Sequence, residues 1–164
     1  MRRGLDIIIL DNEPIICESI SNILGNFYTW GDIHSFTEIS KAVSHVFVRD
    51  VCLGIYIVDV FLEESNGFQF LDAIKPKNPL VYNDAVMITA YASDNVVDMC
   101  LASGINYLLE KPVKPYELQF TIRSLIEKYV RVAMKLNKIP EPIVLCRFDT
   151  SANYSAFSVA SRSF

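Results

Sequence analysis

The sequence predicts an α/β fold in which a doubly wound, five-stranded parallel sheet carries helices on both faces. Short, continuously apolar runs such as 55–58 are typical of strands that are buried on both sides. Segments with helical periodicity separate these runs, and the two patterns alternate five times along the chain. Because crossovers between parallel strands are right-handed, the carboxyl ends of all strands are expected at one edge of the sheet.

The composition indicates one domain, which we place at residues 1–136, followed by a tail at 137–164 of unassigned role. The 164 residues are 51% hydrophobic, which is enough for a core. A net charge of −4 argues against a nucleic-acid surface, which needs clustered Lys and Arg. The four cysteines are too widely spaced for a metal or redox pair. With neither a signal-peptide pattern nor a run of roughly 18 apolar residues, we expect a cytoplasmic protein without a membrane partner.

The first half of the chain holds two strand–helix pairs. The apolar run 5–10 predicts a buried strand, and 12–25 predicts a helix with a proline in its first turn and a glycine at its end. A second strand is expected within 27–36, and a helical pattern follows it. His34 and His45 stand apart from each other and from other candidate ligands in the sequence, so we interpret them as surface or structural residues.

The central strand is expected at 55–58, where the apolar run reaches Asp59 and breaks into an acidic, glycine-terminated loop. A helix follows over 68–74. Two further strands are predicted at 85–89 and 107–109, and the helix between them has a serine in position to cap its start and a glycine at its end.

The last predicted helix runs from Pro115 to Leu136 and carries a heptad-like apolar seam. One face of a domain does not easily cover this whole seam. The sequence therefore leaves two alternatives open, a homodimer through this helix or packing of its second half under the tail. The seam positions are Leu118, Ile122, Leu125, Tyr129, Val132 and Leu136.

Polar residues stand at the ends of four predicted strands, namely Asp11, Asp59, Thr89 and Lys111. Each of these residues, taken alone, could be an ordinary turn or capping residue. Because the strands are parallel, the four side chains are together expected to converge at one edge of the sheet. Two converging carboxylates repel unless a cation separates them, and hard oxygen ligands suit Mg²⁺ or Mn²⁺. A carboxylate between a metal ion and an ammonium, with a hydroxyl beside it, suits phosphoryl transfer.

At these residues the chain resembles the receiver domains of two-component response regulators. The resemblance extends over about residues 5–130, and its four motifs occur in the family's order with the family's spacing. They are ILDNEP at 9–14, IVDVFLEESNG at 57–67, MITAYAS at 87–93 and LLEKPVKPYEL at 108–118.

The resemblance implies a flavodoxin-like receiver fold with Asp59 as the phosphoacceptor and a histidine kinase or phosphotransfer protein as the donor. It implies Mg²⁺ (or Mn²⁺) ligands at Asp11, Asp59 and the backbone carbonyl of Phe61. It also implies Thr89 as the switch hydroxyl and Lys111 as the lysine of the site. The fourth helix, last strand and last helix would form the output surface.

The chain departs from the family pattern at two functional positions. Asn12 replaces the second acid after the first strand; its amide can ligate a cation but adds no charge, so we expect weaker metal binding. Glu13, one residue further, occupies a position where the family usually has an acid, so we do not expect it to compensate. The position of the family's switch aromatic holds Leu108, with Tyr107 one residue away.

Three hypotheses of function follow. The leading one is a receiver without an output enzyme or DNA-binding module, since only 28 residues follow Leu136, acting on a downstream protein that the sequence does not name. The second is a degenerate receiver that binds proteins independently of phosphorylation, as Asn12 and Leu108 favour. The third, an Asp-nucleophile phosphatase, is disfavoured because Phe61 stands where such enzymes carry a second acid.

Overall fold

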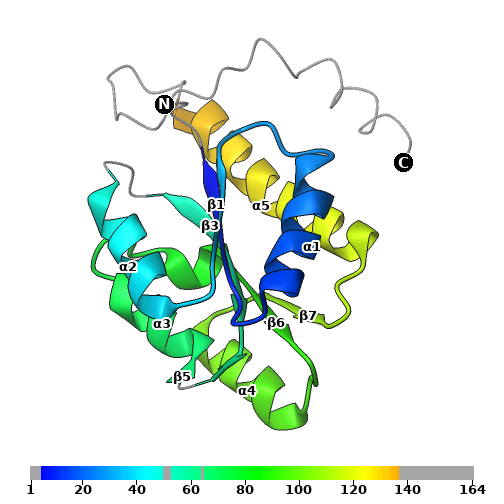
Figure 1. The fold of residues 1–164 in the computed structure, drawn as a ribbon. Coiled ribbons are helices and arrows are strands. Elements are labelled where there is room, and N and C mark those ends of the chain that lie inside the picture. The colour runs from blue at the N-terminus through cyan, green and yellow to red at the C-terminus, as the bar shows by residue number, and fades with distance from the viewer. Residues whose placement is uncertain (1–4, 50–52, 64, 137–164) are drawn as a thin grey trace.

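The computed structural model describes residues 5–49, 53–63 and 65–136, and it confirms the predicted doubly wound fold (Figure 1). Five parallel strands form one sheet in the order β2-β1-β3-β6-β7. The predicted tail at 137–164 lies outside the described residues. The sheet strands are β1 (Asp6–Leu10), β2 (Ile33–Phe36), β3 (Gly54–Asp59), β6 (Ala85–Thr89) and β7 (Tyr107–Glu110).

The helices lie in two layers, one on each face of the sheet (Figure 1). The first layer contains α1 (Pro14–Gly25) and α5 (Pro115–Leu136). The second contains α2 (Ile39–Val48), α3 (Gly67–Ile74) and α4 (Asp94–Ser103), and a 3₁₀ turn, η1 (Val81–Asp84), leads into β6. Each layer encloses a separate hydrophobic core against the sheet, which gives the three-layer arrangement of doubly wound proteins.

The central strands are buried on both faces, which explains their continuous apolar runs. Every residue of β1, β3 and β6 is buried. Because successive side chains point to opposite faces, Ile7 and Ile9 pack toward α1 and α5, whereas Ile8 and Leu10 pack toward the other layer. The register pairs Leu10 with Val58 and Asp59 with Ile88, so these strands end together.

Local capping chemistry sets several helix ends. The side chain of Asn66 accepts a hydrogen bond from Gln69 N–H at the start of α3, and that of Ser93 accepts one from Val96 N–H at the start of α4. Gly104 ends α4 in the left-handed conformation with φ 79°. The acidic loop after Asp59 contains a feature that the sequence did not predict, a short antiparallel hairpin of β4 (Phe61–Leu62) and β5 (Ser65–Asn66).

The apolar seam of α5 packs inside the chain over most of its length. Leu118, Ile122, Leu125 and Tyr129 are at most 6% exposed and belong to the core that α5 shares with α1, whereas Val132 is 44% exposed. The buried Asp84 carboxylate fastens the helix by accepting from Lys128 Nζ at 2.5 Å and from the Tyr129 hydroxyl. The apolar positions of α5 from Leu118 to Tyr129 are thus covered within the chain. They do not need a second copy of the chain to bury them.

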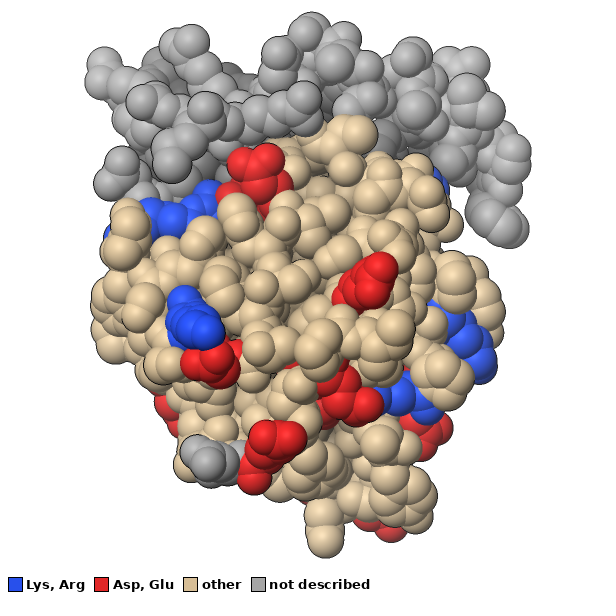
Figure 2. All heavy atoms as spheres, viewed as in Figure 1, with Lys and Arg blue, Asp and Glu red and all other residues tan. Residues whose placement is uncertain are grey.

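The surface seen in Figure 2 shows Lys and Arg side chains dispersed among acidic and uncharged residues, without a continuous basic patch on the described part of that face. None of the helices in the described ranges has the length and hydropathy of a membrane-spanning segment.

Gly67 provides a test of how α3 is held against β3. A Cβ at this position would collide with the carbonyl oxygen of Asp59 and lie 2.6 Å from Val58 Cγ1, whereas one at Gly25 would meet nothing within 4 Å. We expect Gly67→Ala to lower the free energy of unfolding by about 1–3 kcal/mol. Gly25→Ala, at the end of α1, should raise it by about 0.5–1 kcal/mol. Urea unfolding of both variants measures the difference, and equal effects would contradict the close approach.

Candidate functional site

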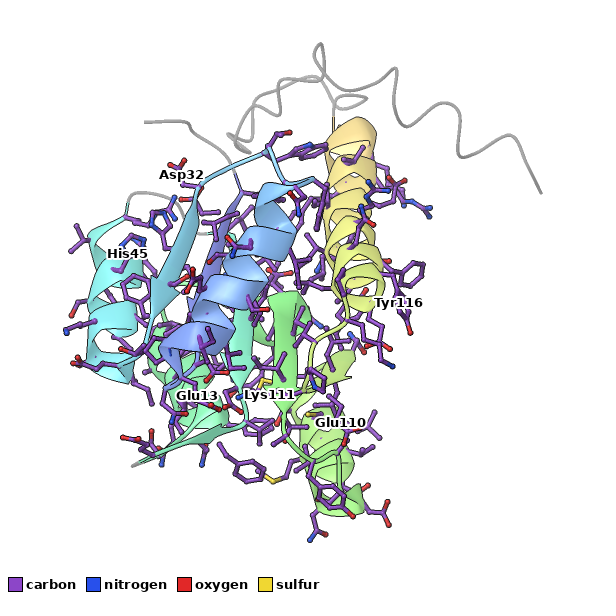
Figure 3. The ribbon with its side chains drawn as sticks, turned by 45° about the vertical axis from the view of Figure 1, so that its right-hand side comes forward. Glu13, Asp32, His45, Glu110, Lys111 and Tyr116 are labelled. Carbon is purple, nitrogen blue, oxygen red and sulfur yellow. The ribbon has the colours of Figure 1, made fainter. Side chains whose placement is uncertain are left out.

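The carboxyl ends of β1, β3, β6 and β7 meet at one edge of the sheet, where Figure 3 shows Glu13, Lys111 and Glu110 in the lower part of the view. Asp11 directly follows β1, Asp59 is the last residue of β3, and Thr89 is the last residue of β6. Lys111 directly follows β7. The structure therefore brings all four predicted residues to this edge.

The ammonium of Lys111 lies between two buried carboxylates. Its Nζ is 2.7 Å from Asp11 Oδ2 and 2.7 Å from Asp59 Oδ2. The side chain of Lys111 is 11% exposed, and those of Asp11 and Asp59 are 0% and 5% exposed. Burial lowers the pKa of Lys111, but the close contacts with the Asp11 and Asp59 carboxylates and the charges of these carboxylates outweigh burial and raise that pKa above its ordinary value. Lys111 therefore stays charged at neutral pH.

Both oxygens of Asp59 have partners. Oδ1 accepts a hydrogen bond from the Phe61 backbone N–H at 3.1 Å, and Oδ2 accepts one from Lys111 Nζ. The first bond holds the start of the β4–β5 hairpin beside the carboxylate, while the Phe61 side chain is 59% exposed. The hairpin thus carries the Phe61 backbone past the site and turns its ring to solvent.

Asp11 is the less compensated of the two acids. Its Oδ1 accepts from the Glu13 backbone N–H at 2.9 Å, whereas Oδ2 is buried and has only the ion pair with Lys111, without hydrogen-bond geometry. Burial raises the pKa of the Asp11 carboxyl, the charge of Asp59 adds to that rise, and Lys111 offsets only part of it. One buried carboxylate oxygen thus remains open to a further positive partner.

These residues fit a hard divalent cation. Asp11 and Asp59 bring two carboxylates against one ammonium, so negative charge is left over in a buried place, and Asp11 Oδ2 offers an oxygen that lacks a hydrogen bond. The Phe61 backbone lies next to Asp59, and Asn12, partly exposed, follows Asp11 directly. Carboxylate, carbonyl and amide oxygens are the ligands that Mg²⁺ and Mn²⁺ prefer.

Thr89 is completely buried, and its hydroxyl is engaged within its own loop. Oγ1 donates to the Tyr91 carbonyl at 3.1 Å and accepts from the Tyr91 N–H at 3.3 Å. Two bonds connect this loop with the end of β7. Lys111 N–H donates to the Thr89 carbonyl at 2.8 Å, and the Glu110 carboxylate accepts from Ala92 N–H at 3.2 Å. The loop after β6 is therefore tied to the strand that carries Lys111.

The two residues at and beside the switch position lie on opposite faces of β7. Leu108 packs against the core under α2, α3 and α4, whereas Tyr107 packs against the core under α1 and α5. Because neighbouring side chains of a strand alternate between faces, Tyr107 cannot take the place of an aromatic residue at position 108.

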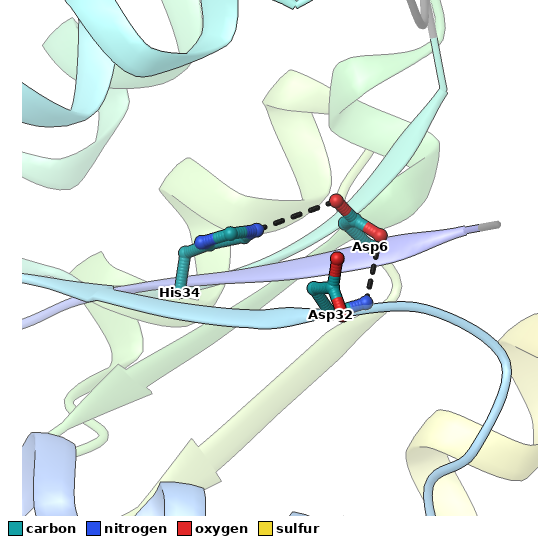
Figure 4. A group of neighbouring side chains, drawn as sticks. All are labelled: Asp6, Asp32 and His34. Carbon is teal, nitrogen blue, oxygen red and sulfur yellow. Dashed lines mark hydrogen bonds and ion pairs between the residues drawn. The ribbon is translucent and has the colours of Figure 1, made fainter. Parts of the chain in front are cut away.

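A second group of ionisable residues, Asp6, Asp32 and His34, lies at the opposite edge of the sheet (Figure 4). Asp6 is the first residue of β1, and Asp11 directly follows the last. The length of the extended strand therefore separates this second group from the Lys111 site by about 17 Å. Asp6 accepts from Asp32 N–H at 2.8 Å and pairs with Arg49, so a side chain of the protein already compensates it.

His34 and His45 stand apart in the sequence but lie side by side in the fold, and their interpretation as surface or structural residues stays a prediction. The rings of His34 and His45 lie 4.3 Å apart, and His34 Nε2 is 3.4 Å from Asp6 Oδ2. They meet because α2 packs across β2, a tertiary contact for which the sequence carries no periodic signal. Burial, with the charges of His34 and Arg49, lowers the pKa of His45.

The doubly wound fold, with Asp11, Asp59 and Lys111 at the carboxyl ends of its strands, is of the receiver type. Comparison with known proteins shows the family. The model of the response regulator receiver domain matches residues 7–123, so the chain belongs to that family. It is also 28% identical over 116 residues to an uncharacterized 14.6 kDa protein in the sodA1 3′ region of Leptolyngbya boryana, covering 70% of this chain and 84% of that protein.

Solved structures share the fold at low sequence identity. A CheY-like receiver domain protein from Methanospirillum hungatei JF-1 superposes with a TM-score of 0.66 at 21% identity, covering 78% of this chain and 98% of the other. Chemotaxis protein CheY4 of Vibrio cholerae superposes with a TM-score of 0.65 at 18% identity, covering 74% of this chain and 98% of the other. A chain of the CheX–CheY–BeF3–Mg²⁺ complex from Borrelia burgdorferi superposes with a TM-score of 0.63 at 17% identity, covering 74% of this chain and 89% of the other.

Because Lys111 compensates the Asp11 carboxylate only in part, we expect Asp11 to lower the stability of the protein in a pH-dependent way when divalent cations are removed. A carboxyl with a raised pKa binds its proton more readily in the folded state than in the unfolded state, so this group lowers stability as the pH rises through its folded pKa. We expect Asp11→Asn in EDTA at pH 7 to raise the free energy of unfolding by about 0.5–2 kcal/mol, and the gain to shrink toward pH 4.

Glu18→Gln is the control, because it removes an exposed carboxylate from the same strand–helix unit. Urea unfolding in EDTA at several pH values measures both variants. A gain for Asp11→Asn that does not depend on pH, or one equal to that of Glu18→Gln, would contradict the assignment.

Proposed function

We propose that this receiver takes a phosphoryl group onto Asp59 from a phosphohistidine of a histidine kinase or phosphotransfer protein. The transfer depends on Mg²⁺ (or Mn²⁺), and it changes a surface that binds a downstream protein. The observation that carries the proposal is the position of Lys111 Nζ, 2.7 Å from both Asp11 and Asp59 at the shared edge of the sheet. No independent output enzyme is proposed.

In the proposed reaction a carboxylate oxygen of Asp59 attacks phosphorus, and the phosphorus–nitrogen bond of the donor breaks with its electron pair returning to the imidazole. Lys111 orients Asp59 beforehand and afterwards pairs with a phosphoryl oxygen. The Phe61 N–H fixes the other carboxylate oxygen. A bound divalent cation, held by Asp11, Asp59 and the Phe61 carbonyl with Asn12 beside them, would supply positive charge for the equatorial oxygens.

The switch that we propose begins at Thr89. Its hydroxyl is bonded to the Tyr91 backbone, and it would turn to a phosphoryl oxygen on Asp59, which carries more charge than a carbonyl. The loop would then move with the hydroxyl and would shift Ala92, whose N–H donates to the Glu110 carboxylate. This couples the site to β7 and to the N-terminus of α4.

The output surface that we propose lies over α4, β7 and α5. A hollow of about 480 Å³ lined by Leu108 and Phe120, among others, lies next to Lys111, and the Phe120 side chain is 74% exposed. Leu101 on α4 adds a 67% exposed apolar side chain. Leu108 stands where the family has its switch aromatic. A movement of the Thr89 loop would therefore reach this surface through the hydrogen bonds that join the loop to the end of β7.

A second candidate function is a protein-binding module that works without phosphorylation. Two observations favour it. Asn12 brings no charge to the cation site, and Lys111 by itself bridges both carboxylates. The phosphatase hypothesis gains no support, because Phe61 turns its ring to solvent where a second acid is required.

Phosphorylation of Asp59 is tested with acetyl phosphate and Mg²⁺. We expect an acid-stable, base-labile phosphoryl adduct by intact mass spectrometry, which disappears in EDTA and in Asp59→Ala. Asp98→Ala, at an exposed carboxylate of α4, should retain the adduct. If wild type and Asp59→Ala label equally, or neither labels, the protein-binding function becomes the better account.

The switch role of Thr89 is tested with beryllofluoride, which mimics the phosphoryl group. We expect Thr89→Val to weaken beryllofluoride binding by about tenfold, since a hydrogen bond to a charged group is lost. It should also abolish amide NMR shifts in α4 and β7. Thr89→Ser keeps the hydroxyl and should keep both responses, whereas shifts of wild-type size in Thr89→Val would contradict the switch.

A further inference from the structure

Glu13 reaches the site from the start of α1. It is the N-cap residue of this helix, yet its side chain makes no capping hydrogen bond. Its Oε1 instead lies 3.5 Å from Lys111 Nζ, the same ammonium that contacts Asp11 and Asp59 (Figure 3). Three carboxylates from β3 and the β1–α1 junction therefore surround one positive group.

The backbone around Glu13 sets this approach. The Glu13 N–H donates to Asp11 Oδ1 at 2.9 Å, so the chain folds back over the buried carboxylate immediately after β1. Pro14 then fixes the first turn of α1. The Glu13 side chain itself is 56% exposed, which leaves it room to turn between water and the site.

The carboxylates within 3.5 Å of the Lys111 ammonium carry more charge than that ammonium balances. Asp11, Asp59 and Glu13 carry three negative charges and Lys111 carries one positive charge, which leaves the equivalent of one divalent cation to be supplied. Asn12, where the resemblance implies an acid, contributes none. Without Glu13 the remaining carboxylates would under-compensate a divalent cation.

We propose that the Glu13 carboxylate completes the divalent-cation site, directly or through one metal-bound water, and supplies the charge that Asn12 lacks. This inference rests on the proposed function, because it concerns the same cation. It replaces the expectation from the sequence that Glu13 does not compensate. The alternative is an exposed salt bridge between Glu13 and Lys111 with no effect on cation affinity.

The test is cation binding by the full chain without any phosphoryl donor, measured by Mg²⁺ calorimetry and Mn²⁺ electron paramagnetic resonance. We expect Glu13→Gln to weaken affinity by about tenfold, as loss of a charge near a divalent ion requires. Glu18→Gln removes an equal charge further along α1 and should change affinity less than about twofold. In the Glu13→Gln background, Asn12→Asp should restore binding. Circular dichroism and urea unfolding in EDTA establish that each variant is folded.

Two outcomes would overturn the inference, and they differ in what they say of the proposed function. If Glu13→Gln matches Glu18→Gln while Asp11→Asn and Asp59→Asn lose binding, Glu13 forms only a surface salt bridge and the proposed function stands. If wild type binds no cation, or binds one that Asp59→Asn does not weaken, the cation-dependent function and the role of Glu13 both fall.

Discussion

The ion pair of the Lys111 ammonium with two buried carboxylates is the constraint on which the rest of the site depends. Burying an ionised carboxylate is costly unless a positive group lies beside it, and here one ammonium serves both Asp11 and Asp59. The compensation is incomplete, as the raised pKa of Asp11 and its oxygen without a hydrogen bond show. Under the proposed function, an added cation would stabilise a site in this condition and would link ligand binding to the fold.

The sheet makes this arrangement rigid. β1 and β3 are buried throughout, and their register brings Leu10 beside Val58, so Asp11, which follows β1, and Asp59, which ends β3, are held near each other. Two independent cores hold the strands from both sides. By contrast, the groups around the carboxylates belong to loops and helix starts. In the proposed function, a change of charge at these carboxylates would therefore move the neighbouring loops rather than the strands.

The Thr89 loop is one of these neighbouring loops. Its hydroxyl is satisfied by the Tyr91 backbone, so leaving that position costs two hydrogen bonds, and a new partner must offer a stronger one. The bond from Lys111 N–H to the Thr89 carbonyl ties the same loop to β7. Leu108 packs into the core under α2, α3 and α4 without a ring, so the proposed switch would act through backbone connections from the site to α4 and α5.

The sequence by itself determined the strand and helix order, because continuous apolar runs mark buried parallel strands and apolar residues at helical spacing mark the helices between them. It also determined which polar residues end the strands, and hence that Asp11, Asp59, Thr89 and Lys111 share one edge. Only the tertiary structure decided the direction of the Thr89 hydroxyl, the approach of Glu13 to a lysine 98 positions away and the contact of His34 with His45. Those features arise from side-chain rotamers and from packing between distant elements, and neither leaves a periodic pattern in the chain.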